Sequence, residues 1–181
     1  MHLENTAAIV TGGASGLGAA TAAALAARGA MVYVLDLAAS IEQAPAVENV
    51  TYLPTDVCDI PQVEAAVATA AGGGLPLRTV VNCAGIGPSM RILGKRGIHD
   101  LELYAKVIQI NLIGSFNVLT LAAAQIAETE ADADGQRGII INTASVAAYE
   151  GQVGQAAYSS SKGGIVGLNL PAARDLAQHG I

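Results

Sequence analysis

A glycine-rich turn between an apolar run and an alanine-rich segment constrains the fold of this chain more than any other feature. Residues 6–10 have the length and composition of a short buried strand. Gly12, Gly16 and Gly18 follow at the spacing G-x-x-x-G-x-G, and a helical pattern then runs to Arg28. Glycines let a backbone approach a phosphate closely, and the free N–H groups of a helix N-terminus attract its charge. The turn therefore predicts a strand, a phosphate-binding corner and a helix, although many glycine turns only make a sharp corner.

The alternation of short apolar runs and helical patterns continues along the whole chain. Further strands are predicted at residues 31–35, 50–53, 80–81 and 139–141, and helices at residues 61–71 and 101–127. A last helix bears Tyr158 and Lys162 and continues to about Gln178, and loops are predicted at residues 87–97 and 128–138. Pro171 is expected to kink or interrupt the last helix. Because strands alternate with helices, right-handed crossovers lead to a parallel sheet. The sequence thus predicts one α/β domain over residues 1–181, a Rossmann-type doubly wound parallel sheet with helices on both faces.

Ligands of such sheets bind at the carboxyl ends of the strands, where this chain places polar and small residues. Asp36 follows the second predicted strand, eighteen residues after Gly18, close to the separation expected for an acid that binds ribose hydroxyls. A carboxylate there repels a 2′-phosphate and favours NAD over NADP; the alternative is a solvated loop acid or a helix cap. Asp56 follows the third strand, where an acid is placed to accept a hydrogen bond from an adenine amino group.

Tyr158 and Lys162 lie four residues apart, so a helix presents them on the same face. An ammonium group near a phenol favours the phenolate, which suits a tyrosine for general acid–base chemistry. Ser145 comes soon after the strand predicted at residues 139–141 and thirteen residues before Tyr158, within reach of a shared pocket. The alternative is a surface Tyr–Lys pair, because Y-x-x-x-K is common by chance.

Two other features allow more than one interpretation. Asn111 lies inside the long helix predicted at residues 101–127, although asparagine is a poor helix former. We expect it to bend the helix, to hold a water or to face solvent. Arg91, Lys95 and Arg96 lie in the predicted loop before that helix, where they are placed to meet an acidic substrate tail. Most such charges only solubilise a surface, and we favour that interpretation here.

Composition excludes several classes of protein. Hydrophobic residues make up 52% of the chain and charged residues 13%, which is unlike a disordered chain. The net charge of −6 argues against a nucleic-acid partner, and no uninterrupted apolar run approaches the ~18 residues of a membrane span. The N-terminus does not resemble a secretory signal. Cys58 and Cys83 lack metal-site spacing, so we expect no metal and two free thiols in a reducing cytoplasm.

With these residues in place, the chain resembles the short-chain dehydrogenase/reductase family over almost its whole length. The matching motifs are T-G-x-x-x-G-x-G from Thr11, N-x-A-G from Asn82, and the set Asn111, Ser145, Tyr158 and Lys162. The segment of residues 135–167 is most similar to members that act on 3-hydroxyacyl-CoA, also described as short-chain hydroxysteroid dehydrogenases. The resemblance therefore implies an NAD-dependent oxidoreductase that interconverts a secondary alcohol and a ketone, with a 3-hydroxyacyl-CoA as substrate.

The resemblance also implies roles for individual residues. Tyr158 would take the proton of the substrate hydroxyl, Lys162 would activate Tyr158 and bind the nicotinamide ribose, Ser145 would orient the substrate oxygen, and Asn111 would hold a proton-relay water. Family members usually form tetramers through their two long helices. The NAD-binding residues expected from the motifs and the resemblance together are Gly12, Ser15, Gly16, Leu17, Gly18, Asp36, Asp56, Val57, Asn82, Cys83, Ala84, Gly85, Tyr158 and Lys162.

Family members usually continue with another strand, a P-G segment that touches the nicotinamide, a substrate lid and a last strand, whereas this chain stops at Ile181. The 181-residue chain alone is therefore expected to be a poor enzyme. The alternatives within the class are a 3-oxoacyl-carrier-protein reductase, which Asp36 disfavours, and a steroid dehydrogenase. A nucleotide-binding scaffold that has lost catalysis is a further alternative. A serine hydrolase is disfavoured because Ser145 does not lie in G-x-S-x-G and no histidine completes a triad signature.

Overall fold

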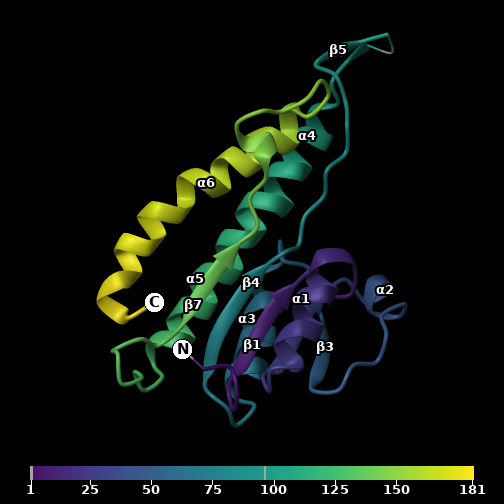
Figure 1. The fold of residues 1–181 in the computed structure, drawn as a ribbon. Helices are drawn as coiled ribbons and strands as arrows, with labels where there is room; N and C mark the ends of the chain where they lie inside the picture. The colour runs from purple at the N-terminus through teal and green to yellow at the C-terminus, as the bar shows by residue number, and fades with distance from the viewer. Residues whose placement is uncertain (1, 96) are drawn as a thin grey trace.

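The central sheet is parallel and follows the strand order β3-β2-β1-β4-β7 (Figure 1). The computed structural model describes residues 2–95 and 97–181, so Arg96, one of the three predicted loop cations, lies outside the described residues. The strands of this sheet are β1 (Ala7–Thr11), β2 (Met31–Asp36), β3 (Val50–Pro54), β4 (Leu77–Asn82) and β7 (Ile139–Asn142). The order reverses direction beside β1, as the predicted doubly wound topology requires.

Helices connect these strands and cover the sheet. They are α1 (Gly16–Ala26), α2 (Ala38–Ile41), α3 (Ile60–Ala71), α4 (Leu101–Ile108), α5 (Ser115–Ala127) and α6 (Ala156–Leu176). A π-helical segment, η1 (Gln109–Gly114), joins α4 to α5, and short 3₁₀ turns lie at η2 (Val146–Ala148) and η3 (Ala177–His179). Asp59 begins α3 by accepting a hydrogen bond from the backbone N–H of Gln62, and Pro61 occupies the first turn.

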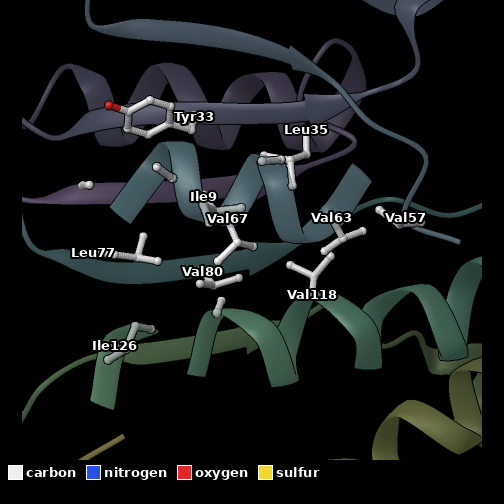
Figure 2. Close-up of a cluster of buried hydrophobic side chains, with 14 residues drawn as sticks. Ile9, Tyr33, Leu35, Val57, Val63, Val67, Leu77, Val80, Val118 and Ile126 are labelled. Carbon is white, nitrogen blue, oxygen red and sulfur yellow. The ribbon is translucent and has the colours of Figure 1, made fainter. Parts of the chain in front are cut away.

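Two apolar clusters fix the helices to opposite faces of the sheet. On one face, side chains of the strands meet α3 and α5, and Figure 2 shows Ile9, Leu77 and Val80 beside Val67 and Val118. On the other face, a cluster of smaller residues holds α1. Strand β1 is buried along its whole length, since both clusters draw on its alternate residues. The predicted fold class is therefore confirmed.

Two sequence expectations were wrong in detail. The segment predicted as a loop at residues 87–97 contains the strand β5 (Leu93–Gly94), and it pairs antiparallel with β6 (Gly97–Ile98) to form a short hairpin. Of the two effects expected of Pro171, an interruption of the helix is wrong, because α6 runs through Pro171 without a break. A proline inside a helix removes one backbone hydrogen bond and places its ring against the carbonyl of the residue four positions earlier, here Gly167; α6 continues on both sides of Pro171 despite this cost.

Asn111 occupies the π-helical segment between α4 and α5, and its side chain is fully buried. Of the three interpretations, the solvent-facing one is therefore wrong. A π-helical turn inserts one extra residue per turn and is frequently found at functional sites. Here the irregularity rotates one polar side chain into the space between the chain after β4 and helix α6.

The long helical stretch Leu101–Ala127 is, among the described residues, the one helix whose length and composition would also suffice to cross a membrane. Its most apolar window is 44% buried inside the fold. Leu119, Ala122 and Ile126 point into the interior of the domain. Packing against the sheet and α3 therefore accounts for much of its apolar character.

Candidate active site

The floor of the candidate site is a close contact between the backbones that follow β1 and β4. Gly12 has a positive φ of 65°, and a Cβ atom there would lie only 2.8 Å from the Cα of Ala84. Gly18 is packed so tightly on the carbonyl group of Gly12 that a side chain would overlap it. Glycine is required at both places because any larger residue would push the turn away from the sheet.

A threonine hydroxyl holds this contact together. The Oγ1 atom of Thr11 accepts hydrogen bonds from the backbone N–H groups of Cys83 and Ala84, both at 3.1 Å. The Thr11 side chain is 1% exposed, so these bonds are shielded from water. The two loops are thus fixed to each other at the carboxyl edge of the sheet.

Asp36 stands at the end of β2, and both of its carboxylate oxygens accept backbone hydrogen bonds. Oδ2 accepts from the N–H of Ala14 at 2.9 Å and Oδ1 accepts from the N–H of Leu37 at 2.8 Å. The acid therefore also orients the glycine turn, a role that its position in the sequence did not reveal.

These loops enclose a cavity of about 560 Å³, within the usual size range of small-molecule sites. Most residues predicted to bind a dinucleotide line it: Gly12, Ser15, Gly16, Leu17, Gly18, Asp36, Asp56, Val57, Cys83, Ala84 and Gly85. Tyr158 and Lys162 do not line it, and neither does Asn82. The Asn82 side chain is 2% exposed and donates hydrogen bonds to Asn142 and to the carbonyl of Ser115, so it links the end of β4 to β7 and to α5.

The side chain of Asn111, which was predicted to be catalytic, joins separate parts of the chain by hydrogen bonds; we call this group of contacts the Asn111 clamp. The Nδ2 group of Asn111 donates to the carbonyl of Ile86 at 2.8 Å and to Oγ of Ser161 at 3.0 Å, and its Oδ1 accepts from the N–H of Ile86 at 2.8 Å. These bonds tie the chain after β4 to the π-helical segment and to α6. Both N–H groups of the side-chain amide are thus used, and the amide fixes the surroundings of Tyr158 and Lys162.

Tyr158 and Lys162 meet on one face of α6, as their spacing predicted. The Nζ atom of Lys162 lies 5.8 Å from the centre of the Tyr158 ring and donates a hydrogen bond to the carbonyl of Thr143 at 2.6 Å. Burial lowers the pKa of Lys162, and the neighbouring Cys83 thiol opposes this shift weakly. The Tyr158 hydroxyl has no hydrogen-bond partner among the described residues, which leaves it available to a ligand.

Ser145 begins the 3₁₀ turn η2, where its Oγ accepts a hydrogen bond from the N–H of Ala147 at 3.1 Å. Its hydroxyl hydrogen remains free to be donated to a ligand. Because η2 packs against α6, the segment that carries Ser145 lies beside the helix that carries Tyr158.

Three supporting residues were not found from the sequence. Thr143 supplies the carbonyl that holds Lys162, and its hydroxyl donates to the Cys83 sulfur at 3.6 Å, which links the lysine to the dinucleotide-sized cavity. Ser161 completes the Asn111 clamp. Lys106, an exposed residue of α4, lines the same cavity. Thr143 follows β7 directly, so the rule that sites collect at strand ends was the one available signal.

The arrangement can bind a dinucleotide and handle one proton. The glycine floor and the N-terminus of α1 suit phosphates, the two acids suit hydroxyl and amino groups, and Tyr158 is a proton donor or acceptor beside a cation. Within residues 2–95 and 97–181, no group of three or more His, Cys, Asp and Glu side chains has metal-binding geometry.

Comparisons with known proteins give consistent results. The family model of short chain dehydrogenases matches residues 6–181. Human 3-hydroxyacyl-CoA dehydrogenase type-2 is 51% identical over 179 residues, an alignment that covers 96% of this chain and 69% of the relative. The protein of the same name from Drosophila melanogaster is 47% identical over 184 residues and is 72% covered.

A solved structure agrees with the sequence relatives. The crystal structure of 3-hydroxyacyl-CoA dehydrogenase type-2 from Mycobacterium avium has a TM-score of 0.88 and 39% sequence identity to this chain. The match covers 99% of this chain and 72% of that one. The described fold is thus that of the relatives over nearly all of its length.

Burial of Lys162 predicts a pH-dependent contribution to stability. In the unfolded chain its pKa is the ordinary 10.5, and in the folded chain it is lower. Between these two values the unfolded state binds more protons, so folding becomes more favourable as the pH rises. Relative to Lys162→Met, the wild-type protein should therefore gain stability as the pH rises through this window toward 10.5.

Urea unfolding of both proteins from neutral pH to this value measures the difference. Lys106→Met, which removes an exposed lysine, is the matched control and should leave the difference from wild type independent of pH. A stability difference for Lys162→Met that falls as the pH rises would contradict the assignment of burial as the cause.

Proposed function

Because this chain belongs to the short-chain dehydrogenase/reductase family and is an oxidoreductase acting on CH–OH groups, we propose that it uses NAD to interconvert 3-hydroxyacyl-CoA and 3-oxoacyl-CoA. Relatives that are 47–51% identical carry the name 3-hydroxyacyl-CoA dehydrogenase type-2, which supports this substrate class. The observation that carries the proposal is the connection from the cavity to the proton-transferring pair. Cys83 lines the cavity, Thr143 contacts Cys83, and the carbonyl of Thr143 holds Lys162 beside Tyr158.

The residues present fit a dinucleotide. The Gly12 and Gly18 contacts leave a shallow glycine floor, and the Asp36 carboxylate reaches the same cavity. When bound there, NAD would supply a hydride acceptor for the carbon that bears the substrate hydroxyl.

The chain's own residues would handle the proton. As the C–H bond of the alcohol gives up its electron pair, the O–H proton passes to the oxygen of Tyr158 and the carbon–oxygen bond becomes a carbonyl. Ser145 Oγ donates a hydrogen bond to the substrate oxygen. The Lys162 ammonium stabilises negative charge on the Tyr158 oxygen, and Thr143 keeps that ammonium in place. Asn111 keeps α6 at a fixed distance from the chain after β4.

We assign the preference for NAD over NADP to Asp36. Its oxygens are held by the N–H groups of Ala14 and Leu37, so the carboxylate has little freedom to turn away from the cavity. A 2′-phosphate placed near it would meet a fixed negative charge. The same charge can accept hydrogen bonds from the ribose hydroxyls of NAD.

The proposal includes assembly into a homotetramer through the two long helices. Ile113 and Phe116 of the first helix and Leu170 of α6 are between 41% and 56% exposed. An apolar groove of about 630 Å³ lies between α5 and α6 and includes Phe116, Leu168 and Pro171. Exposed apolar surface of this extent on two adjacent helices suits a second copy of the same pair.

Replacing the tyrosine hydroxyl tests the reaction. Tyr158→Phe should lower the rate of NADH formation from NAD and a short 3-hydroxyacyl-CoA by roughly 10²–10⁴-fold, because general acid–base catalysis contributes that much. Binding of NADH, followed by its fluorescence, should persist because the ring is kept. Tyr149→Phe is the matched control, since Tyr149 is 76% exposed and should leave the rate unchanged. Equal rates for Tyr158→Phe and wild type would refute the assigned proton carrier.

Neutralising the acid tests the cofactor preference. Asp36→Asn should lower the ratio of NAD affinity to NADP affinity by about tenfold or more, or ~1.4 kcal/mol, because the charge that repels the 2′-phosphate is gone. Fluorescence titration with NADH and NADPH measures both affinities. Asp56→Asn, on the wall of the same cavity, should leave the ratio nearly unchanged. A ratio equally insensitive to both substitutions would show that Asp36 does not set the preference.

Placing a charge on the exposed apolar face of α5 tests the proposed assembly into a homotetramer. Phe116→Asp should weaken self-association by about tenfold or more, or ~1.4 kcal/mol, because it buries a carboxylate against an apolar partner. Sedimentation velocity over a concentration series measures this. Ile60→Asp, at an exposed apolar position of α3, should sediment as wild type does. A monomeric wild-type protein at all concentrations would refute the proposal.

A further inference from the structure

The glycine turn that forms the floor of the dinucleotide-sized cavity carries no charged side chain. No Asp, Glu, Lys or Arg occurs between Glu4 and Arg28, a stretch that contains β1, the turn and α1. The backbone N–H groups at the start of α1 suit a phosphate, but they carry only partial charges. A full positive charge beside a bound pyrophosphate must therefore come from another wall of the cavity.

The lining of this cavity includes a single cation, which α4 contributes. Among the described residues that line the cavity, Lys106 is the one Lys or Arg. The same lining contains the carboxylates of Asp36 and Asp56. Without Lys106, the charged side chains of the lining would all be negative, and they would repel an anionic ligand. Lys106 thus decides whether the cavity offers any side-chain charge that attracts a phosphate.

The ammonium group of Lys106 is available to a ligand. It has no hydrogen-bond or ion-pair partner among the described residues. Asp36 and Asp56 already accept hydrogen bonds from backbone N–H groups. Glu102, which lies one helical turn before Lys106 on α4, forms no ion pair with it in the described part of the chain. No ion pair therefore has to break before Lys106 contacts an anion.

Helix α4 fixes the backbone from which the Lys106 side chain extends. Asp100 caps this helix by accepting two backbone N–H hydrogen bonds, at 2.9 and 3.1 Å. Val107 is fully buried. Ile110, one turn after Lys106 on the same face, lines the same cavity and packs against the apolar core. The Lys106 side chain itself is exposed, so a flexible stem carries the ammonium from a fixed point on the cavity wall.

We propose that Lys106 contacts the pyrophosphate of the bound dinucleotide and supplies the full positive charge that the glycine turn lacks. This inference rests on the proposed function, because it concerns the cofactor of the same site. The glycine turn and the N-terminus of α1 hold the pyrophosphate from one wall, and the Lys106 ammonium approaches it from another. Lysine suits this role because it binds phosphate as a point charge on a flexible stem. Lys106 is thus a cofactor-binding residue outside the sequence motifs.

Binding of ADP-ribose, which keeps the pyrophosphate but has no nicotinamide, tests this contact without turnover. In Lys106→Met the dissociation constant should rise about tenfold, because a hydrogen bond to a charged group is lost. In Lys106→Arg, which keeps the charge, it should rise less than about threefold. Calorimetric titration measures both. Lys95→Met removes the same charge from a residue that lines a different cavity, and it should bind ADP-ribose as the wild type does. Equal dissociation constants for Lys106→Met and wild type would overturn the inference.

The salt dependence of the same binding separates an effect of charge from a loss of packing. The screening length of water falls from about 30 Å at 0.01 M salt to about 3 Å at 1 M salt. Across this range the ADP-ribose affinity of the wild type should fall more steeply than that of Lys106→Met, and the two affinities should converge at high salt. Parallel salt dependences would show that Lys106 does not act through its charge, and the inference would fail.

Turnover distinguishes this inference from the proposed function. If the wild type and Lys106→Met oxidise a short 3-hydroxyacyl-CoA with the same KM for NAD and bind ADP-ribose equally, the inference fails and the proposed function stands. If no 3-hydroxyacyl-CoA is oxidised but ADP-ribose binding depends on Lys106, the phosphate contact stands and the proposed reaction fails.

Discussion

The contact between the loops after β1 and β4 is the constraint on which the rest of the site depends. Gly12 lies against the backbone of Ala84, and the hydroxyl of Thr11 accepts two N–H bonds from the same loop. Without this contact the position of the glycine turn relative to the sheet would not be fixed, and the N-terminus of α1 would not face the cavity. The close approach works only because neither side contributes a bulky side chain. The close contact between the two loops therefore requires small residues at these strand ends.

A second set of buried polar contacts connects the loop after β4 to α6. Asn111 is bonded to both backbone groups of Ile86 and to Ser161, so the chain that leaves β4 and the helix that carries Tyr158 hold one another. Lys162 reaches back from α6 to the carbonyl of Thr143 at the end of β7. Unpaired groups at such depth would cost about 1–3 kcal/mol each, which gives these contacts a strong preference for one arrangement. The π-helical turn is the local irregularity that points Asn111 at its partners.

The sequence predicted the strands and helices of the fold and the residues that share a face, but it did not predict the local irregularities. The strand ends at Asp36 and Asn82 could be predicted because short apolar runs stop there, and Tyr158 and Lys162 share a face because helix periodicity requires it. The hairpin of β5 and β6 was missed because two-residue strands leave no periodic pattern. The rule that a proline ends a helix failed at Pro171, because the proline costs α6 one backbone hydrogen bond and the helix continues on both sides of it. The clamp formed by Asn111 joins residues 25 and 50 positions apart, and no local signal reports that.

Charge in the dinucleotide-sized cavity has to admit one phosphate group and disfavour another. The glycine floor and the N-terminus of α1 suit the pyrophosphate that joins the two halves of NAD. The Asp36 carboxylate lines the same cavity and is held by the N–H groups of Ala14 and Leu37, so a further phosphate on the adenosine ribose would meet a fixed negative charge. The selectivity proposed here therefore depends on the position of each charge rather than on the net charge of the cavity, and the hydrogen bonds that fix Asp36 also hold the glycine turn in place.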